Sequence, residues 1–115
     1  MADPIPFRRP VHWDRLRADE AERIIRERAK DTRNIIIGTH AFDRIPERSI
    51  LQEDVYRVLR TGYIDAQPER TGKGEWKAVV VKRIAGHREA GVVTIIFRDN
   101  DTLFIKTVEW MDTAR

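Results

Sequence analysis

The chain has 115 residues, a length that fits one domain with a modest core and is too short for two. Charged residues make up 36% of it and hydrophobic residues 41%, which is a globular composition rather than a disordered one. The net charge is +3, so a nucleic acid or an acidic protein is a permitted partner, and neither is required. The sequence contains no cysteine, which excludes disulfides, thiolate zinc sites and cysteine nucleophiles.

The histidines and the hydropathy pattern argue against a metalloprotein and against a membrane protein. His12, His40 and His87 fall in different segments and form no H-x-x-x-H pair, so we expect neither a metal site nor a cofactor. No apolar run approaches the ~20 residues of a membrane span, and no signal-peptide core follows Met1. We therefore expect a soluble cytoplasmic protein with no membrane partner.

The N-terminal part of the chain predicts an arm followed by a helix. Residues 1–12 carry three prolines and predict an extended, poorly ordered arm. The single domain is expected over residues 13–112, with a short tail at 113–115. Asp14 is a candidate N-cap for a helix that runs to about Asp31. The apolar stripe of this helix is narrow, which is typical of a helix that covers a domain along one edge.

A short strand and a helix are expected next. Residues 34–37 are an apolar, β-branched run that ends at Gly38, which predicts a buried strand. Thr39 is a candidate N-cap for the following helix. Pro46 removes a helical N–H and restricts the residue before it, so we expect a break in helix geometry within residues 44–49.

A second helix and the start of the sheet follow. Ser49 and Gln52 have the spacing of a capping box at the start of this helix, and Gly62 supplies its C-terminal stop. Residues 63–66 predict a short edge strand. Residues 67–74 are polar and rich in glycine, which predicts a loop.

Three strand-length runs complete the chain. Residues 76–84, 91–98 and 102–110 are rich in Val, Ile, Phe and Trp, and short turns at 85–89 and 99–101 separate them. The order predicts an α/β fold of the α+β type. In this single small domain the N-terminal helices pack on a twisted, mainly antiparallel sheet of about four to five strands. One sheet face is apolar and should take the helices, whereas Lys82 or Arg83 with Arg98 would form a shallow basic floor on the other.

The chemistry-bearing pattern is a histidine and two arginines spaced four residues apart. His40, Arg44 and Arg48 would share one face of a helix. A titratable imidazole beside two permanent cations suits a phosphate group. The same spacing also fits a solvated face that only positions the helix.

The ordered motifs of the second half resemble a known family. The segment His40-Ala41-x-x-Arg44-x-x-x-Arg48-x-Ile50-x-x-x-Asp54-Val55-x-x-Val58-Leu59-x-x-Gly62 resembles the signature of the domain of unknown function 4258. The same family's sheet is similar to Gly74-Glu75-Trp76-Lys77, Arg88-Glu89-Ala90-Gly91-Val92-Val93-Thr94 and Lys106-Thr107-Val108-Glu109-Trp110. The resemblance spans residues from about 14 to 112. The chain departs from the family pattern at Pro46, at Ser49, where glycine is usual, and at Leu51, where a serine N-cap is usual.

This resemblance implies a fold and an activity. In architecture the family is similar to the RelE/ParE/BrnT-like toxins of toxin–antitoxin pairs. Many RelE-type members cut mRNA without a metal, and ParE-type members poison gyrase. The resemblance therefore implies a RelE-like toxin that cleaves RNA, with RNA or the ribosome and an acidic antitoxin as partners. The alternative is a non-catalytic protein-binding module of the same fold, or a toxin that acts on a protein target.

Metal-free RNA cleavage requires an acid or base and cations for the charged phosphorane. His40 is the candidate acid or base, and Arg44 and Arg48 are the candidate ligands of the phosphate. Arg98, Lys106 and Lys82 are candidate binding residues from the sheet. The structural alternative is that His40 caps or packs the helix while Arg44 pairs with a nearby carboxylate.

Overall fold

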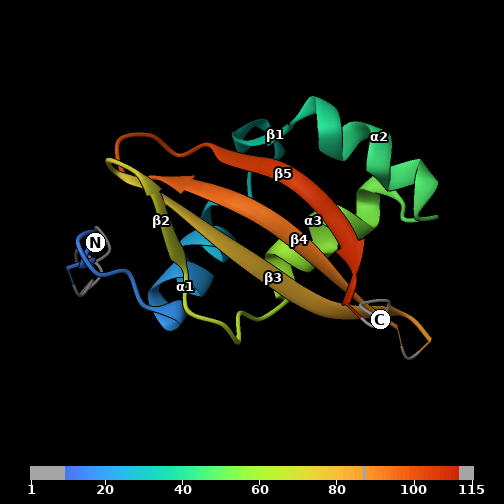
Figure 1. Ribbon diagram of the computed structural model, residues 1–115, viewed down its shortest axis with the longest axis horizontal. Coiled ribbons are helices and arrows are strands. Elements are labelled where there is room, and N and C mark those ends of the chain that lie inside the picture. The colour runs from blue at the N-terminus through green and yellow to red at the C-terminus, as the bar shows by residue number, and fades with distance from the viewer. Residues whose placement is uncertain (1–9, 87, 112–115) are drawn as a thin grey trace, which may run out of the picture.

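The structure is a computed structural model that describes residues 10–86 and 88–111 (Figure 1). These residues form three α-helices, one 3-10 turn and five strands. In chain order they are α1 (Ala18–Arg28), the 3-10 turn Thr32–Asn34, β1 (Ile35–Ile37), α2 (Thr39–Glu47), α3 (Gln52–Thr61), β2 (Glu69–Gly72), β3 (Glu75–Ala85), β4 (Arg88–Phe97) and β5 (Leu103–Trp110). The expected arm lies outside the described residues as far as residue 9, and the expected tail lies wholly outside them.

All five strands belong to one sheet with the order β1-β5-β4-β3-β2. β1 pairs with β5 in parallel, and the other neighbours are antiparallel. Figure 1 shows α1 and α3 on one face of the sheet and α2 beside the edge at β5. The predicted α+β fold with a mainly antiparallel sheet is therefore confirmed. No helix among residues 10–86 and 88–111 is both long and apolar enough to cross a membrane.

The core lies between the helices and one face of the sheet. Its largest fully buried apolar side chains are Leu16, Ile25, Val55, Val58, Leu59, Val80, Val92, Ile96, Leu103, Ile105 and Val108. Strand residues of the core recur with the period of two that a half-covered sheet requires. The expectation that the apolar face takes the helices is confirmed.

The expected basic floor on the opposite face is wrong. Lys82 is two residues from the core residue Val80, so it lies on the helix side, whereas Arg83 lies on the opposite face. Arg98 is two residues from the core residue Ile96 and therefore does not join Arg83 there. The opposite face presents buried Val93 and Ile95 at its centre. Apolar side chains therefore occupy the place where cations were expected.

The first helix begins later than predicted. Its N-cap is Arg17, and Asp14 lies four residues before the first helical residue. The backbone of the preceding segment is held by distant side chains instead. The Trp76 indole Nε1 donates to the Trp13 carbonyl at 2.9 Å, and Gln67 Nε2 donates to the Leu16 carbonyl at 2.6 Å. These tertiary bonds keep the segment out of the helix.

The junction between α2 and α3 confirms the expected break. Gly38, rather than Thr39, is the N-cap of α2, and Pro46 lies in its last turn. The helix ends at Glu47, and Ser49 then takes a left-handed φ of 58°. This conformation is costly for a residue with a Cβ, and it explains why glycine would suit the position.

The start of α3 differs from the prediction. Its N-cap is Leu51, so the capping box expected from Ser49 and Gln52 is wrong. The Asp54 carboxylate accepts from the Leu51 backbone N–H at 3.1 Å, but a leucine side chain offers no acceptor in return. At the other end Gly62 terminates the helix, as predicted.

The edge strand of the sheet also lies elsewhere than expected. Within residues 63–66 only Tyr63 forms a bridge, to Val81. The edge strand is β2, inside the segment predicted as a loop. It forms a tight hairpin with β3, whose turn includes Gly74 at a φ of 71°. The three long strands are confirmed, although β4 begins at Arg88 within the expected turn.

Candidate functional site

The position of α2 is fixed by contacts with the edge of β5. The Gly38 N–H at the start of α2 donates to the Ile105 carbonyl at 2.9 Å. Ala41 and Ile45 are buried one helical turn apart and face the core. His40 and Arg44 each precede one of these residues, so they lie on an adjoining side of the helix, which is exposed at His40 and partly exposed at Arg44.

His40 and Arg44 lie together on this exposed side. His40 is exposed, and Arg44 Nε donates to His40 Nε2 at 3.4 Å. A guanidinium can only donate, so this contact requires an unprotonated Nε2 and a neutral imidazole. Arg44 also forms an ion pair with Glu47 through Nη1. The pair can thus offer a proton acceptor beside a planar cation.

Arg48 is not part of this pair. Its Nε donates to the Val108 carbonyl of β5 at 2.9 Å, and its own carbonyl accepts from Trp110 Nε1 at 2.8 Å. It is the C-cap of α2, where the backbone leaves helical geometry. The spacing of four therefore no longer fixes its direction. β1 pairs only with residues 103–105, so the rest of this edge of β5 is not paired with β1. Arg48 connects the end of α2 to that part of β5.

The three candidate binding residues of the sheet do not share a surface. Lys82 pairs with Ala90, whereas Arg98 follows Phe97 at the far end of β4. Phe97 is seven positions after Ala90 along the strand, a distance of about 23 Å. Lys106 is exposed and occupies a bulge, because the β4–β5 register passes from Ile105 directly to Thr107. No common phosphate site joins them.

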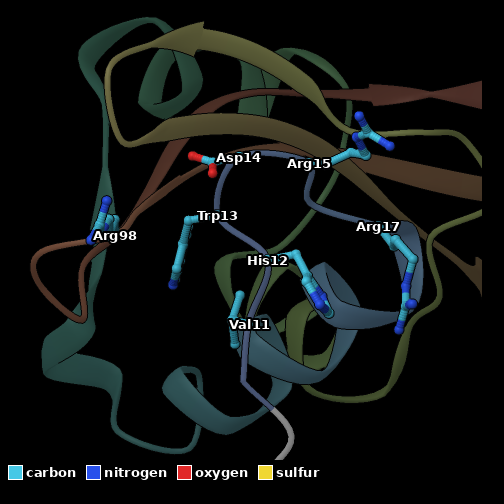
Figure 2. A pocket seen from close by; sticks show the side chains of 7 residues that line it. All are labelled: Val11, His12, Trp13, Asp14, Arg15, Arg17 and Arg98. Carbon is cyan, nitrogen blue, oxygen red and sulfur yellow. The ribbon is translucent and has the colours of Figure 1, made fainter.

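A different group of cations surrounds a pocket near the N-terminal end of the described chain (Figure 2). It has a volume of about 650 Å³ and is lined by Val11, His12, Trp13, Asp14, Arg15, Arg17 and Arg98. Arg98, predicted as a binding residue, belongs here. The other lining residues were missed because they were assigned to an arm and to the expected start of the helix. No spacing rule for helices or strands links them.

His12 in this pocket rests on a buried carboxylate. Glu20 is 1% exposed and accepts from the His12 backbone N–H at 3.2 Å, from His12 Nδ1 at 2.8 Å and from the Arg17 N–H at 3.1 Å. Burial opposes ionisation of Glu20, but the hydrogen bonds from Arg17 and His12 and the nearby guanidinium charge outweigh it. They hold the pKa of this carboxyl below its usual range.

Among the described residues, no group of His, Asp or Glu side chains is arranged to hold a metal ion. The side chains at the candidate sites carry imidazole, carboxylate and guanidinium groups.

Comparison with known proteins identifies a family over most of the domain. No curated protein and no solved structure matches this chain. The model of the domain of unknown function DUF4258 matches residues 37–110. These are 74 residues (110 − 37 + 1) of the 115, so the match starts later than the resemblance suggested and leaves out α1 and His12. It covers the last residue of β1 and every element from α2 through β5, including the His40–Arg44 pair, and the chain belongs to the DUF4258 family.

Proposed function

We propose that the protein is a RelE-like toxin of a toxin–antitoxin pair that cleaves RNA without a metal ion. His40 is the proton-transfer group, and Arg44 is the ligand of the scissile phosphate. The observation that supports this proposal is the exposed His40–Arg44 contact at 3.4 Å on α2. RNA, free or on the ribosome, is the substrate, and a cytoplasmic location follows from it.

The proposed reaction uses the neutral imidazole that this contact requires. Arg44 turns its planar donors to the phosphate and leaves His40 Nε2 free to accept the proton of the 2′-hydroxyl. The 2′-oxygen attacks phosphorus, and the bond from phosphorus to the 5′-oxygen breaks. The leaving 5′-oxygen takes a proton from water, and the hydroxide that remains takes the proton held by His40, so the products are a 2′,3′-cyclic phosphate and a 5′-hydroxyl. Arg44 stabilises the extra negative charge of the phosphorane.

The test compares variants of the pair with a variant of Arg48. His40→Ala should lower the cleavage rate roughly 10²–10⁴-fold, the usual contribution of a positioned acid or base. Arg44→Ala should also lower it, and Arg44→Lys should not restore it fully, because an ammonium lacks the planar fork. Arg48→Ala is the matched control, because its side chain is engaged with β5 and should affect stability rather than chemistry.

The assay uses nuclease-free protein on free mRNA and on translating ribosomes, with and without EDTA. Circular dichroism verifies that each variant is folded. Cleavage that persists in EDTA and depends on His40 supports the proposal. A folded His40→Ala protein that cleaves as fast as the wild type would refute it.

An exposed apolar groove favours a second function, that of a protein-binding module. Phe42 and Leu51 are each 63% exposed. The groove that they flank is lined by Phe42, Ile45, Pro46, Ser49, Ile50, Leu51 and Gln52. Leu51 is a poor N-cap, and the left-handed backbone of Ser49 is strained. These two residues of the α2–α3 junction therefore lower the stability of the fold. Exposed apolar patches of this kind mark interaction sites.

The occupant proposed for the groove is an acidic partner protein, the antitoxin of the pair. Its apolar side chains would fill the groove, and its carboxylates would reach His40 and Arg44 on the same helix. The test measures the affinity of an acidic protein encoded by the adjacent reading frame for the wild type and for Phe42→Ser. Met111→Ser is the control, because Met111 is also exposed but lies at the end of β5. Hydrogen-exchange protection confined to α1 would contradict this placement.

A further inference from the structure

The pocket around His12 is lined by residues outside the family match, except for Arg98, and has features of a ligand site. We propose that it binds a small nucleotide, with the phosphate at His12 and Arg17 and the base between Trp13 and Arg98. Its volume of about 650 Å³ suits a ligand of this size. The proposal goes beyond RNA cleavage on α2 and does not depend on it.

His12 is held in one orientation by the carboxylate beneath it. Its Nδ1 lies 2.8 Å from Glu20 Oε2, and the side chain of Glu20 is 1% exposed whereas that of His12 is 62% exposed. A carboxylate accepts only, so Nδ1 carries a hydrogen, and Nε2 is on the opposite side of the ring, away from Glu20. Burying a carboxylate is costly, and here it fixes an exposed imidazole. When protonated, Nε2 donates to a phosphate oxygen.

The charge of the pocket favours an anion. Its lining contains three guanidinium groups, from Arg15, Arg17 and Arg98, against the carboxylate of Asp14 and that of Glu20 beneath His12. Arg17 is paired with exposed Asp19 through its Nε at 3.1 Å. The carboxylate nearest to Arg98 in an ion pair is that of Asp99, at 4.0 Å. Guanidinium groups hold phosphate through paired donors, and such exposed ion pairs are readily exchanged for a phosphate.

The arrangement of the side chains favours a ligand longer than a bare phosphate. Figure 2 shows His12 and Arg17 on one side of the N-terminal segment and Trp13 and Arg98 on the other. The Trp13 backbone is fixed by the bond from Trp76, and Arg28 lies 5.9 Å from the centre of the Trp13 ring. A base can stack on an indole and on a guanidinium plane. A nucleotide laid across this segment reaches both sets of side chains, which a bare phosphate cannot do.

The experiment titrates the full chain with AMP, inorganic phosphate and adenosine, followed by NMR signals of the His12 ring and the Trp13 indole. AMP should shift both signals saturably and bind at least about tenfold more tightly than phosphate or adenosine. Phosphate can make only the contacts with His12 and Arg17, and adenosine only those with Trp13 and Arg98. Equal affinity for AMP and adenosine, or for AMP and phosphate, would overturn the proposal. So would the absence of saturable shifts at both residues.

Variants separate the site from general attraction by charge. Arg98→Ala should weaken AMP binding about 10- to 100-fold, the value of a lost stacking contact with a base. His12→Asn keeps a donor for Glu20 and deletes Nε2, so it should remain folded and weaken AMP binding similarly. Arg33→Ala, which removes a cation whose side chain is 88% exposed and outside the pocket, is the control. If Arg33→Ala lost as much affinity for AMP as Arg98→Ala, binding would depend on general charge, and the proposed site would be refuted.

Discussion

Glu20 should stabilise the fold through its charge, and Glu20→Gln tests this directly. The carboxylate accepts three hydrogen bonds, and the shortest is 2.8 Å long, from His12 Nδ1. A glutamine retains one acceptor oxygen, so its amide group must face the Arg17 N–H or the two donors of His12. One donor then loses its acceptor if the amide group faces Arg17, and two do if it faces His12, and the remaining bonds lose the assistance of the charge. The free energy of unfolding should fall by about 2–3 kcal/mol at pH 7.

The pH dependence separates this effect from a simple loss of packing. The pKa of Glu20 is lowered in the folded protein, so its contribution to stability is present above the pKa of the unfolded chain. That contribution is lost as the pH falls through the lower, folded value. The wild type and Glu20→Gln should therefore converge in stability in acid, because the wild-type carboxyl becomes neutral.

Urea unfolding followed by tryptophan fluorescence measures the difference at each pH. At neutral pH the midpoint of Glu20→Gln should be lower by on the order of 1 M, given a typical urea dependence for a small domain. Asp19→Asn is the control, because Asp19 is exposed in the same turn and should leave the midpoint nearly unchanged. A difference that persists undiminished in acid would refute the assignment of the effect to charge.

Two further substitutions test the packing of the helices. Gly62→Ala should destabilise the protein by about 2 kcal/mol in the same urea assay, because overpacking cannot be relieved by side-chain movement here. The added Cβ would lie 2.6 Å from the Val58 carbonyl oxygen and 2.7 Å from that of Val81, and an unchanged midpoint would show that the backbone yields. Leu51→Ser should raise the free energy of unfolding by about 1 kcal/mol, because serine supplies the missing acceptor at the N-cap. A fall in stability would instead show that the leucine side chain packs usefully.

The sequence predicts those elements that are determined by neighbours along the chain. The long strands follow from alternating β-branched runs, and the break after α2 follows from the missing N–H of Pro46. The contact between His40 and Arg44 follows from the helical spacing of four. Each of these inferences uses residues within a few positions of one another.

The remaining features depend on partners that are distant in the chain. β2 has the sequence ERTG, which has no strong strand preference, and it forms because β3 pairs with it. Arg48 turns away from its predicted partners because the Val108 carbonyl, 60 residues later, is available to it. His12 lies outside any helix or strand, so no periodicity predicts its contact with Glu20 of α1.

The parallel pairing of β1 with β5 has a consequence for the order of folding. Residues 35–37 of β1 pair with residues 103–105, so this part of the sheet closes a loop that contains most of the domain. Closing such a loop costs entropy before any contact compensates for it, whereas the hairpins of β2 to β5 form locally. β1 and α2 should therefore join a meander that is already assembled, and should be the first part to detach from it. The surface that carries His40 and Arg44 would then exist only in the completed fold, and a folding intermediate would lack it.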